Sequence, residues 1–301
     1  MFEIVIKTIL PIFLLIALGA FAKARGIFKP EDEKVFSSYI YYFSLPALFL
    51  INLAETKFTF ETLRFIGAAV SPVLLVLLLF LFVGFIFRLK NKTTTLLISS
   101  SLFGSTAFFG VPFVIFAFNN LLEERLAVLT AAVISAVAVV IVTLTLEIYS
   151  GQGGGAKKFL KNPLLLSIFL GIIVSLSGFE LPVYLASALH MLGKTTATVA
   201  IFMLGIFLWG REYKNLFKAG LLSLFRMILM PAVALLVVGL FNLHDVEAKM
   251  IVLMHAMPLA ISMIVLSNRY GFEEETIASE ILITSLLSVV YLNVWLWFLR
   301  A

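Results

Sequence analysis

The sequence contains no cysteine and few charged residues. Without cysteine there is neither a disulfide framework nor thiolate chemistry. Charged residues make up 13% of the 301 residues and apolar residues 62%, and the mean hydropathy is +1.11. A soluble domain of this length needs far more polar side chains to cover its surface. The composition therefore predicts an all-α membrane protein whose outer surface faces lipid.

Enzyme motifs are also missing. The chain has no H-E-x-x-H motif, no G-x-S-x-G motif and no paired acidic motif for prenyl chemistry. Its three histidines, His190, His244 and His255, are too scattered in the sequence to predict a metal site. The net charge of +5 comes from short basic clusters between apolar stretches, which is typical of cytoplasmic loops and not of a nucleic-acid-binding surface. We therefore expect no enzyme activity, cofactor, metal or nucleic-acid partner.

The chain is rich in apolar stretches of the length that crosses a bilayer, about 20 residues. A cleaved signal peptide is the alternative for the first stretch, but Glu3 stands where a basic region belongs and further apolar stretches follow. Residues 181–192 are expected to form a short interfacial helix before the seventh span. The ten predicted spans are residues 8–22, 35–54, 65–87, 93–118, 126–148, 163–179, 193–210, 219–241, 250–268 and 276–299.

A Gly-rich basic segment divides the chain. Residues 150–162 read SGQGGGAKKFLKN and have no apolar face. We therefore expect a first five-helix repeat at 1–150, a cytoplasmic linker at 151–162 and a second five-helix repeat at 163–301. Because each half has an odd number of spans, the second half enters the membrane from the opposite side, as in the inverted repeats of many secondary transporters. Most Lys and Arg residues fall on the side of the linker, so both termini are predicted to lie outside.

The fourth span of each half contains a proline near its middle, in Gly104–Pro112 (GSTAFFGVP) and Met254–Ser262 (MHAMPLAIS). Paired interruptions of this kind indicate a transporter binding site. A broken helix exposes N–H groups at the start of its second half, and their partial positive charge favours an anion. The alternative is that both prolines only kink packed helices. The predicted substrate-binding residues are Ser105, Thr106, Gly110, Pro112, His255, Pro258 and Ser262.

Titratable residues are rare in the predicted spans. Glu147 and Glu280 approach the membrane, but neither is predicted at a midplane, where cation exchangers place carboxylates. Their positions favour an anion over a cation as substrate. His255 is either a proton-coupling group or carboxylate donor, or a neutral histidine bonded to a backbone carbonyl that the proline leaves free. Lys194 and Arg226 are interpreted as snorkelling side chains at the interface.

Four separated motifs resemble the auxin efflux carrier family of bacterial and plant permeases, within the bile/arsenite/riboflavin transporter superfamily. The most specific is AMPLAISMIVLSNRYGFEEETIASEILITSLLS (Ala256–Ser288), which is similar to the family's ninth and tenth helices. The others are GSTAFFGVP, SLPALFL (Ser44–Leu50) and NPLLLSIFLGIIVSLSGFELP (Asn162–Pro182), in the same order and spacing. The resemblance covers nearly the whole chain. The short linker is similar to that of the bacterial members.

The resemblance implies a sodium/proton antiporter-like fold of ten helices, in which the broken fourth and ninth helices cross. Helices 1, 2, 6 and 7 would form a scaffold and a homodimer surface, and helices 3–5 and 8–10 a transport domain that moves as an elevator. In the plant carriers an Asn seven residues before the crossover proline helps to hold the substrate carboxylate, and Ser105 stands at that position here.

For function, the resemblance implies a multi-pass carrier in the cell membrane. Its substrate would be a small organic anion: a mono- or dicarboxylate such as malate or malonate, or an auxin-like acid. A proton or sodium ion is the possible coupling partner. The alternative is a cation/proton antiporter or a bile-acid-type sodium symporter with the same fold.

Overall fold

The computed structural model describes residues 2–29, 31–118, 120–151, 163–243 and 245–299. In these ranges the regular structure is helical, and the extended backbone is limited to one isolated antiparallel bridge between Gly104 and Leu259. The chain forms two compact units, each built from segments of both halves. The predicted linker lies outside the described residues, apart from Gly151.

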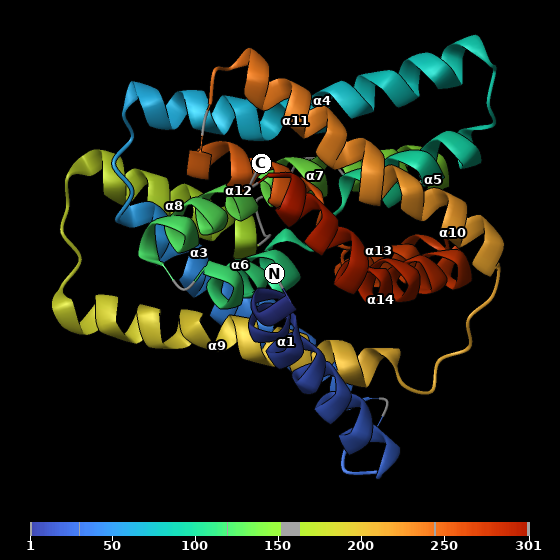
Figure 1. Cartoon of the computed structure of the whole chain (residues 1–301), viewed down its shortest axis with the longest axis horizontal. Coiled ribbons are helices and arrows are strands. Elements are labelled where there is room, and N and C mark those ends of the chain that lie inside the picture. Colours follow the sequence, from blue (N-terminus) through green and yellow to red (C-terminus); the bar gives the residue numbers. More distant parts are fainter. Residues whose placement is uncertain (1, 30, 119, 152–162, 244, 300–301) are drawn as a thin grey trace. The chain divides into compact units, whose positions relative to one another are not determined.

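The first unit comprises Met1–Leu63, Ala107–Ala132 and Ala156–Arg211. In it α1 packs against α9, and α3 packs against both α8 and α9 (Figure 1). A Cβ atom on Gly205 would overlap the carbonyl of Ile16, so only glycine lets the backbones of α9 and α1 approach this closely. Its elements are α1 (Phe2–Ala24), α2 (Asp32–Tyr39), the π-helical turn η1 (Ile40–Ser44), α3 (Leu45–Ala54), α6 (Val111–Phe118), the start of α7 (Leu121–Ser150), α8 (Pro163–Ser177) and α9 (Val183–Leu208).

Helix α9 corrects one prediction. The predicted interfacial helix at 181–192 and the predicted span at 193–210 form one continuous helix, which begins after Pro182. Gly193, where the two were expected to separate, lies against Leu48 of α3, and a Cβ atom there would sit 3.1 Å from the Leu48 Cα atom. The glycine therefore allows close packing in the middle of α9 and does not end the helix.

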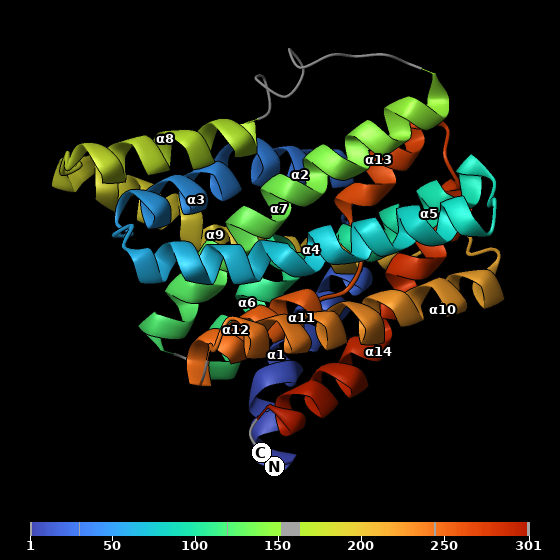
Figure 2. The ribbon, with the colours of Figure 1, turned by 90° about the horizontal axis from the view of Figure 1, so that it is seen from above.

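The second unit comprises Arg64–Thr106, Val133–Gly155 and Glu212–Ala301. Here α10 packs against α14, and α11 packs against α12 (Figure 2). Its elements are α4 (Phe60–Ile86, from Arg64 on), α5 (Asn91–Leu102), the end of α7, α10 (Leu216–Leu224), the π-helical turn η4 (Phe225–Leu229), α11 (Met230–Leu240), α12 (Asp245–His255), α13 (Ser262–Tyr270) and α14 (Glu274–Phe298).

Several helices are long and apolar enough to cross a membrane. Among the described residues six meet this description, and three shorter apolar helices accompany them at Leu10–Ala24, Thr106–Phe118 and Pro163–Ser177. The chain is therefore a helical protein with several membrane-spanning segments. The six long candidates are Asp32–Ala54, Phe60–Ile86, Leu121–Ser150, Val183–Leu208, Leu216–Leu240 and Glu274–Phe298.

Candidate functional site at two interrupted helices

The helix in the first predicted interruption ends earlier than its proline suggests. α5 ends at Leu102, a non-helical stretch covers residues 103–105, and the π-helical turn η2 (Thr106–Gly110) leads into α6. Because η2 runs directly into α6, Pro112 lies within one continuous helix, Thr106–Phe118, just after its π-helical turn. The break therefore lies at Phe103–Ser105, and Pro112 sits inside the helix that follows.

The second interruption contains its proline, as the sequence predicts. α12 ends at His255, and α13 begins at Ser262. Residues 256–261 between them, with Pro258 near the middle, are not helical. Proline lacks an amide, so it cannot donate to the carbonyl four residues earlier, that of Met254.

The two interruptions pair with each other inside the second unit, and this place is called the crossing from here on. The amide of Ser105 donates to the carbonyl of Pro258 at 2.7 Å, and the amide of Ala260 donates to the carbonyl of Phe103 at 2.9 Å. The amide of Leu259 donates to the hydroxyl of Thr284 on α14 at 3.2 Å. These three amides, which precede the second half of each broken helix, are therefore satisfied internally, and the predicted anion would have to use other donors.

Arg226 fills the crossing. Its side chain, in η4, is fully buried. Nε donates to the carbonyl of Met257 and Nη1 to that of Ser101, both at 2.7 Å, while Nη2 donates to the carbonyl of Met254 at 3.5 Å. The guanidinium thus caps the C-terminal ends of α5 and α12, where the helix dipoles carry partial negative charge. The interpretation of Arg226 as a snorkelling residue is wrong, because its charge is satisfied inside the protein.

Gly104 makes room for this guanidinium. A Cβ atom at position 104 would overlap Nη2, Cζ and Nε of Arg226. The glycine therefore serves a close side-chain approach at the break, and any larger residue would displace the cation or the bridge to Leu259.

The predicted site residues fall into both units. Ser105, Thr106, His255, Pro258 and Ser262 belong to the second unit. The Ser105 hydroxyl is buried and makes no hydrogen bond to a described residue, and the Thr106 hydroxyl lies 3.0 Å from that of Ser135. Ser262 is the first residue of α13. The other two predicted residues, Gly110 and Pro112, belong to the first unit.

His255 is fully buried at the end of α12. Its Nε2 atom lies 2.9 Å from the carbonyl of Ala69 on α4, which can only accept, so Nε2 carries the proton of this bond. Nδ1 is buried without a described partner. The Met254 carbonyl, to which Pro258 cannot donate, accepts from the Met257 amide at 3.4 Å and from Arg226 Nη2 at 3.5 Å, and not from His255.

Glu280, one of two carboxylates predicted to approach the membrane, lies in the second unit. On α14 it is fully buried, and its Oε2 atom accepts a hydrogen bond from the Ser100 hydroxyl at 2.6 Å. Its Oε1 atom is buried and makes no hydrogen bond to a described residue. The available signal was its charge within a predicted span, because ionisable residues in membrane helices are usually functional.

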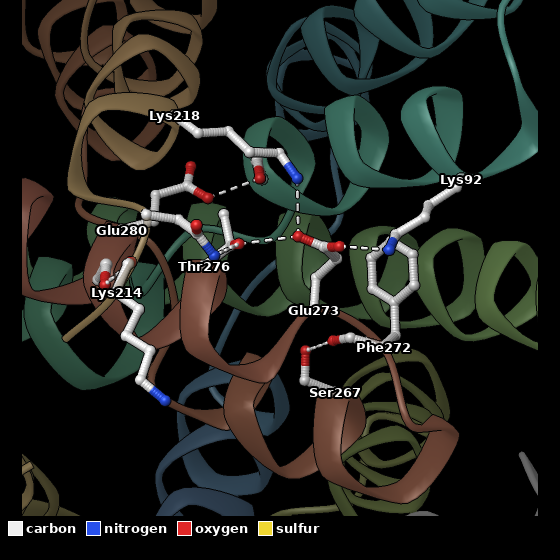
Figure 3. A network of polar contacts seen from close by, with 11 residues as sticks. Lys92, Lys214, Lys218, Ser267, Phe272, Glu273, Thr276 and Glu280 are labelled. Atoms are coloured by element: carbon white, nitrogen blue, oxygen red, sulfur yellow. Dashed lines mark hydrogen bonds and ion pairs between the residues drawn. The ribbon is translucent and has the colours of Figure 1, made fainter. Parts of the chain in front are cut away.

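A second polar cluster lies among three helices of this unit (Figure 3). Glu273, just before α14, binds Lys92 of α5 at 2.5 Å, Lys218 of α10 at 2.7 Å and the Thr276 hydroxyl at 2.7 Å. Partial burial acts to raise the pKa of Glu273, but the hydrogen bonds from Lys218, Lys92 and Thr276 outweigh it and lower this pKa to about 2. The cluster therefore ties α5, α10 and α14 together by charge.

Two interrupted helices that pair at their breaks, in a chain of apolar membrane-length helices, define a membrane carrier. A model of the family described as "Membrane transport protein" matches residues 4–159 and 155–296. The chain therefore belongs to this family, which confirms the resemblance to the auxin efflux carriers.

Relatives of similar length carry transporter names. An uncharacterized transporter of Methanocaldococcus jannaschii is 29% identical, over 97% of both chains. A protein of Rhizobium meliloti named "Putative malonate transporter" is 26% identical, over 97% of this chain and 95% of its own. The uncharacterized transporter YfdV of Escherichia coli K12 is 23% identical, over 98% of both chains.

Proposed function

We propose that this membrane transporter is a secondary carrier that moves a small organic anion across the cell membrane by elevator-type alternating access. The observation that carries the proposal is the buried guanidinium of Arg226 at the pairing of the two breaks. None of the described carboxylates forms an ion pair with it. A buried cation without a carboxylate partner favours an anionic guest.

The hydroxyl of Ser105 supports this site. A buried hydroxyl that lacks a protein partner has a hydrogen bond left to give, and a ligand carboxylate accepts such bonds. Thr106 beside it and Ser262 at the amino end of α13 add two more hydroxyls, and a helix amino end favours negative charge. We therefore place the anion next to Ser105, Thr106, Pro258 and Ser262.

The substrate class follows from charge and from one relative. The R. meliloti relative is named for malonate, a small dicarboxylate. Serine and threonine hydroxyls, a helix amino end and a nearby guanidinium are groups that bind carboxylates as well as phosphates. Malonate or malate is therefore the first substrate to test, and an auxin-like monocarboxylate the second.

We extend the proposal to the architecture. The carrier would have ten spans in two inverted repeats, with both termini outside, and it would form a homodimer. The division into two compact units supports an elevator, in which one unit carries the crossing and the other acts as scaffold. Because the chain has no cysteine, a single cysteine placed near each end and labelled with an impermeant maleimide tests the orientation.

Buried Glu280 is the one observation that favours a cation/proton antiporter or a sodium symporter instead. The two classes differ in a simple assay. A cation exchanger reconstituted in liposomes moves protons or sodium without any organic acid, whereas an organic-anion carrier needs the acid.

The test is a thermal-shift panel of organic acids, with and without sodium, followed by uptake of the stabilising acid into proteoliposomes. Ser105→Ala is the informative variant. It removes a hydroxyl with no described partner, so we expect no loss of stability, while binding of the acid weakens about tenfold or more for a hydrogen bond to a charged group.

Ser99→Ala is the matched control, because the Ser99 hydroxyl is also buried without a described partner but lies inside α5, one helical turn before the break. Its binding should equal that of the wild type. Normal binding by Ser105→Ala, Thr106→Val and Ser262→Ala together would show that the site has been assigned wrongly. Absence of any acid-dependent uptake would refute the anion carrier.

A further inference from the structure

Glu280 has a surrounding that suits a carboxylic acid better than a carboxylate. It is fully buried, and one of its oxygens has a single neutral donor, Ser100 of α5. The other oxygen has no hydrogen bond to a described residue. An ionised carboxylate normally accepts several hydrogen bonds or pairs with a cation, and burying one without them is strongly unfavourable.

Arg226 is the charged group near Glu280, and its hydrogen bonds are directed elsewhere. Nε, Nη1 and Nη2 all donate to backbone carbonyls at the ends of α5 and α12. The negative ends of these two helices therefore take all the hydrogen bonds that Arg226 makes to described residues. Arg226 acts on Glu280 only through space, so an ionised Glu280 would be buried without a hydrogen-bonded cation.

The other charged groups on the neighbouring elements do not pair with Glu280 either. On α10, Lys218 binds Glu273, and before α10 the Lys214 side chain binds Glu275 and Glu212. On α12, His255 bonds to Ala69. The Ser279 hydroxyl, beside Glu280 in the sequence, donates to the Lys214 carbonyl. None of these groups gives Glu280 a charged partner.

We propose that Glu280 is the coupling site of the carrier and binds the proton that travels with the organic anion. This inference rests on the proposed function. While an anion occupies the crossing, a second negative charge on Glu280 is unfavourable, so the carboxyl keeps its proton. When the anion has left and water reaches the crossing, the O–H bond breaks, the proton passes to water and the carboxylate remains. Proton and anion therefore bind together and move in the same direction.

Glu280 is a better candidate than His255, the coupling residue that the sequence suggests. His255 also lies within electrostatic reach of Arg226, so its protonation would place a second cation in the same buried region. Protonation of Glu280 removes a charge there instead. The two residues therefore respond in opposite ways to the same neighbour, and only the carboxyl can follow the charge of an anion.

A first experiment measures the proton itself. Infrared difference spectra of the purified protein between about pH 6.5 and about pH 10, where ordinary Asp and Glu side chains stay ionised, should show the loss of a carboxylic acid C=O band in the wild type. The band change should be absent in Glu280→Gln, which keeps the size and the hydrogen bond from Ser100. Glu147→Gln is the matched control, because Glu147 is a buried carboxylate on α7 that accepts from Tyr270, and it should show the wild-type band change. If Glu280→Gln shows the same band change as the wild type, the proposal is overturned.

A second experiment measures coupling, with labelled malonate as the probe and the membrane potential clamped. In wild-type proteoliposomes an inward gradient of about one pH unit should raise the accumulation ratio up to about tenfold for one proton per molecule. Glu280→Gln should keep malonate exchange within about threefold of the wild type but lose the accumulation, and Glu147→Gln should keep both.

The outcomes separate the two proposals. If the wild type exchanges malonate but a pH gradient drives no accumulation, or a sodium gradient drives it in its place, the coupling proposal fails and the carrier stands. If Glu280→Gln still accumulates malonate with the pH gradient, the assigned residue is wrong. If the wild type carries neither malonate nor any acid that stabilises it, the proposed function fails, and the infrared result decides on its own whether Glu280 holds a titrating proton.

Discussion

Replacement of Arg226 is the sharpest test of the crossing. In Arg226→Met the carbonyls of Ser101 and Met257 each lose a hydrogen bond of 2.7 Å from a charged donor and stay buried. Such bonds contribute about 1.5–3 kcal/mol each, so we expect a loss of about 3–5 kcal/mol in the free energy of unfolding. Arg226→Lys should lose less, because it keeps the charge but cannot reach three carbonyls with one ammonium group.

The assay is reversible unfolding in mixed micelles, followed by tryptophan fluorescence. Trp295 of α14 is a local reporter, since its indole N–H donates to the carbonyl of Met227, the residue after Arg226, at 2.9 Å. Gly220→Ala is a suitable control on α10, where an added Cβ atom meets nothing within 4 Å. It should be neutral or stabilise by up to about 1 kcal/mol.

Gly104→Ala completes a double-mutant cycle. Alone it should destabilise, because its Cβ atom would overlap the guanidinium. Combined with Arg226→Met, which is flexible and can move away, it should cost much less than the sum of the two changes. If the effects simply add, or if Arg226→Met unfolds within about 1 kcal/mol of the wild type, the guanidinium does not hold the two breaks together and the reasoning is refuted.

Two further predictions concern the Glu273 cluster of the second unit and the close helix packing of the first. The hydrogen bonds from Lys218 and Lys92 lower the pKa of Glu273 to about 2 from 4.5, so its stabilisation is present above pH 4.5 and is lost as the pH falls toward 2. Because both lysines are about half exposed, we expect a loss of about 1–2 kcal/mol over this window, seen as a fall in Tm that Glu273→Gln does not show. In the first unit, Gly205→Ala should destabilise by roughly 2 kcal/mol or more, because it pushes α9 away from the backbone of α1, and equal Tm values for Gly205→Ala and Gly220→Ala would contradict the close packing.

Much of the fold could be predicted from hydropathy, because a membrane helix must satisfy its backbone within itself and so leaves a long apolar stretch in the sequence. The presence of two interruptions could also be predicted from the sequence, from Pro112 and Pro258. The location of the first break could not be found, since a proline inside a helix and a proline in a break look alike in sequence. Its true marker is Gly104, which has to touch Arg226.

The burial of Arg226 and Glu280 could not be predicted from the sequence, for a related reason. In a membrane protein the residues that face lipid and those that face the core are both apolar, so periodicity does not say which way a single polar residue in a span points. Arg226 could equally reach the interface or the interior. Only the positions of α5 and α12, whose carbonyls it binds, decide between the two.

The contacts of Arg226 also change the physical explanation of the proposed preference for an anion. A broken helix offers a positive amino end and a negative carboxyl end, so a break alone favours neither sign of charge. In the second unit the carboxyl ends of α5 and α12 are both bonded to Arg226, while the amino end of α13 has no carboxylate bonded to it among the described residues. The negative ends are thus neutralised and the positive end is left to act. The proposed preference for an anion therefore depends on Arg226 and not on the prolines, and we expect a neutral residue in its place to weaken anion binding even where the crossing keeps its shape.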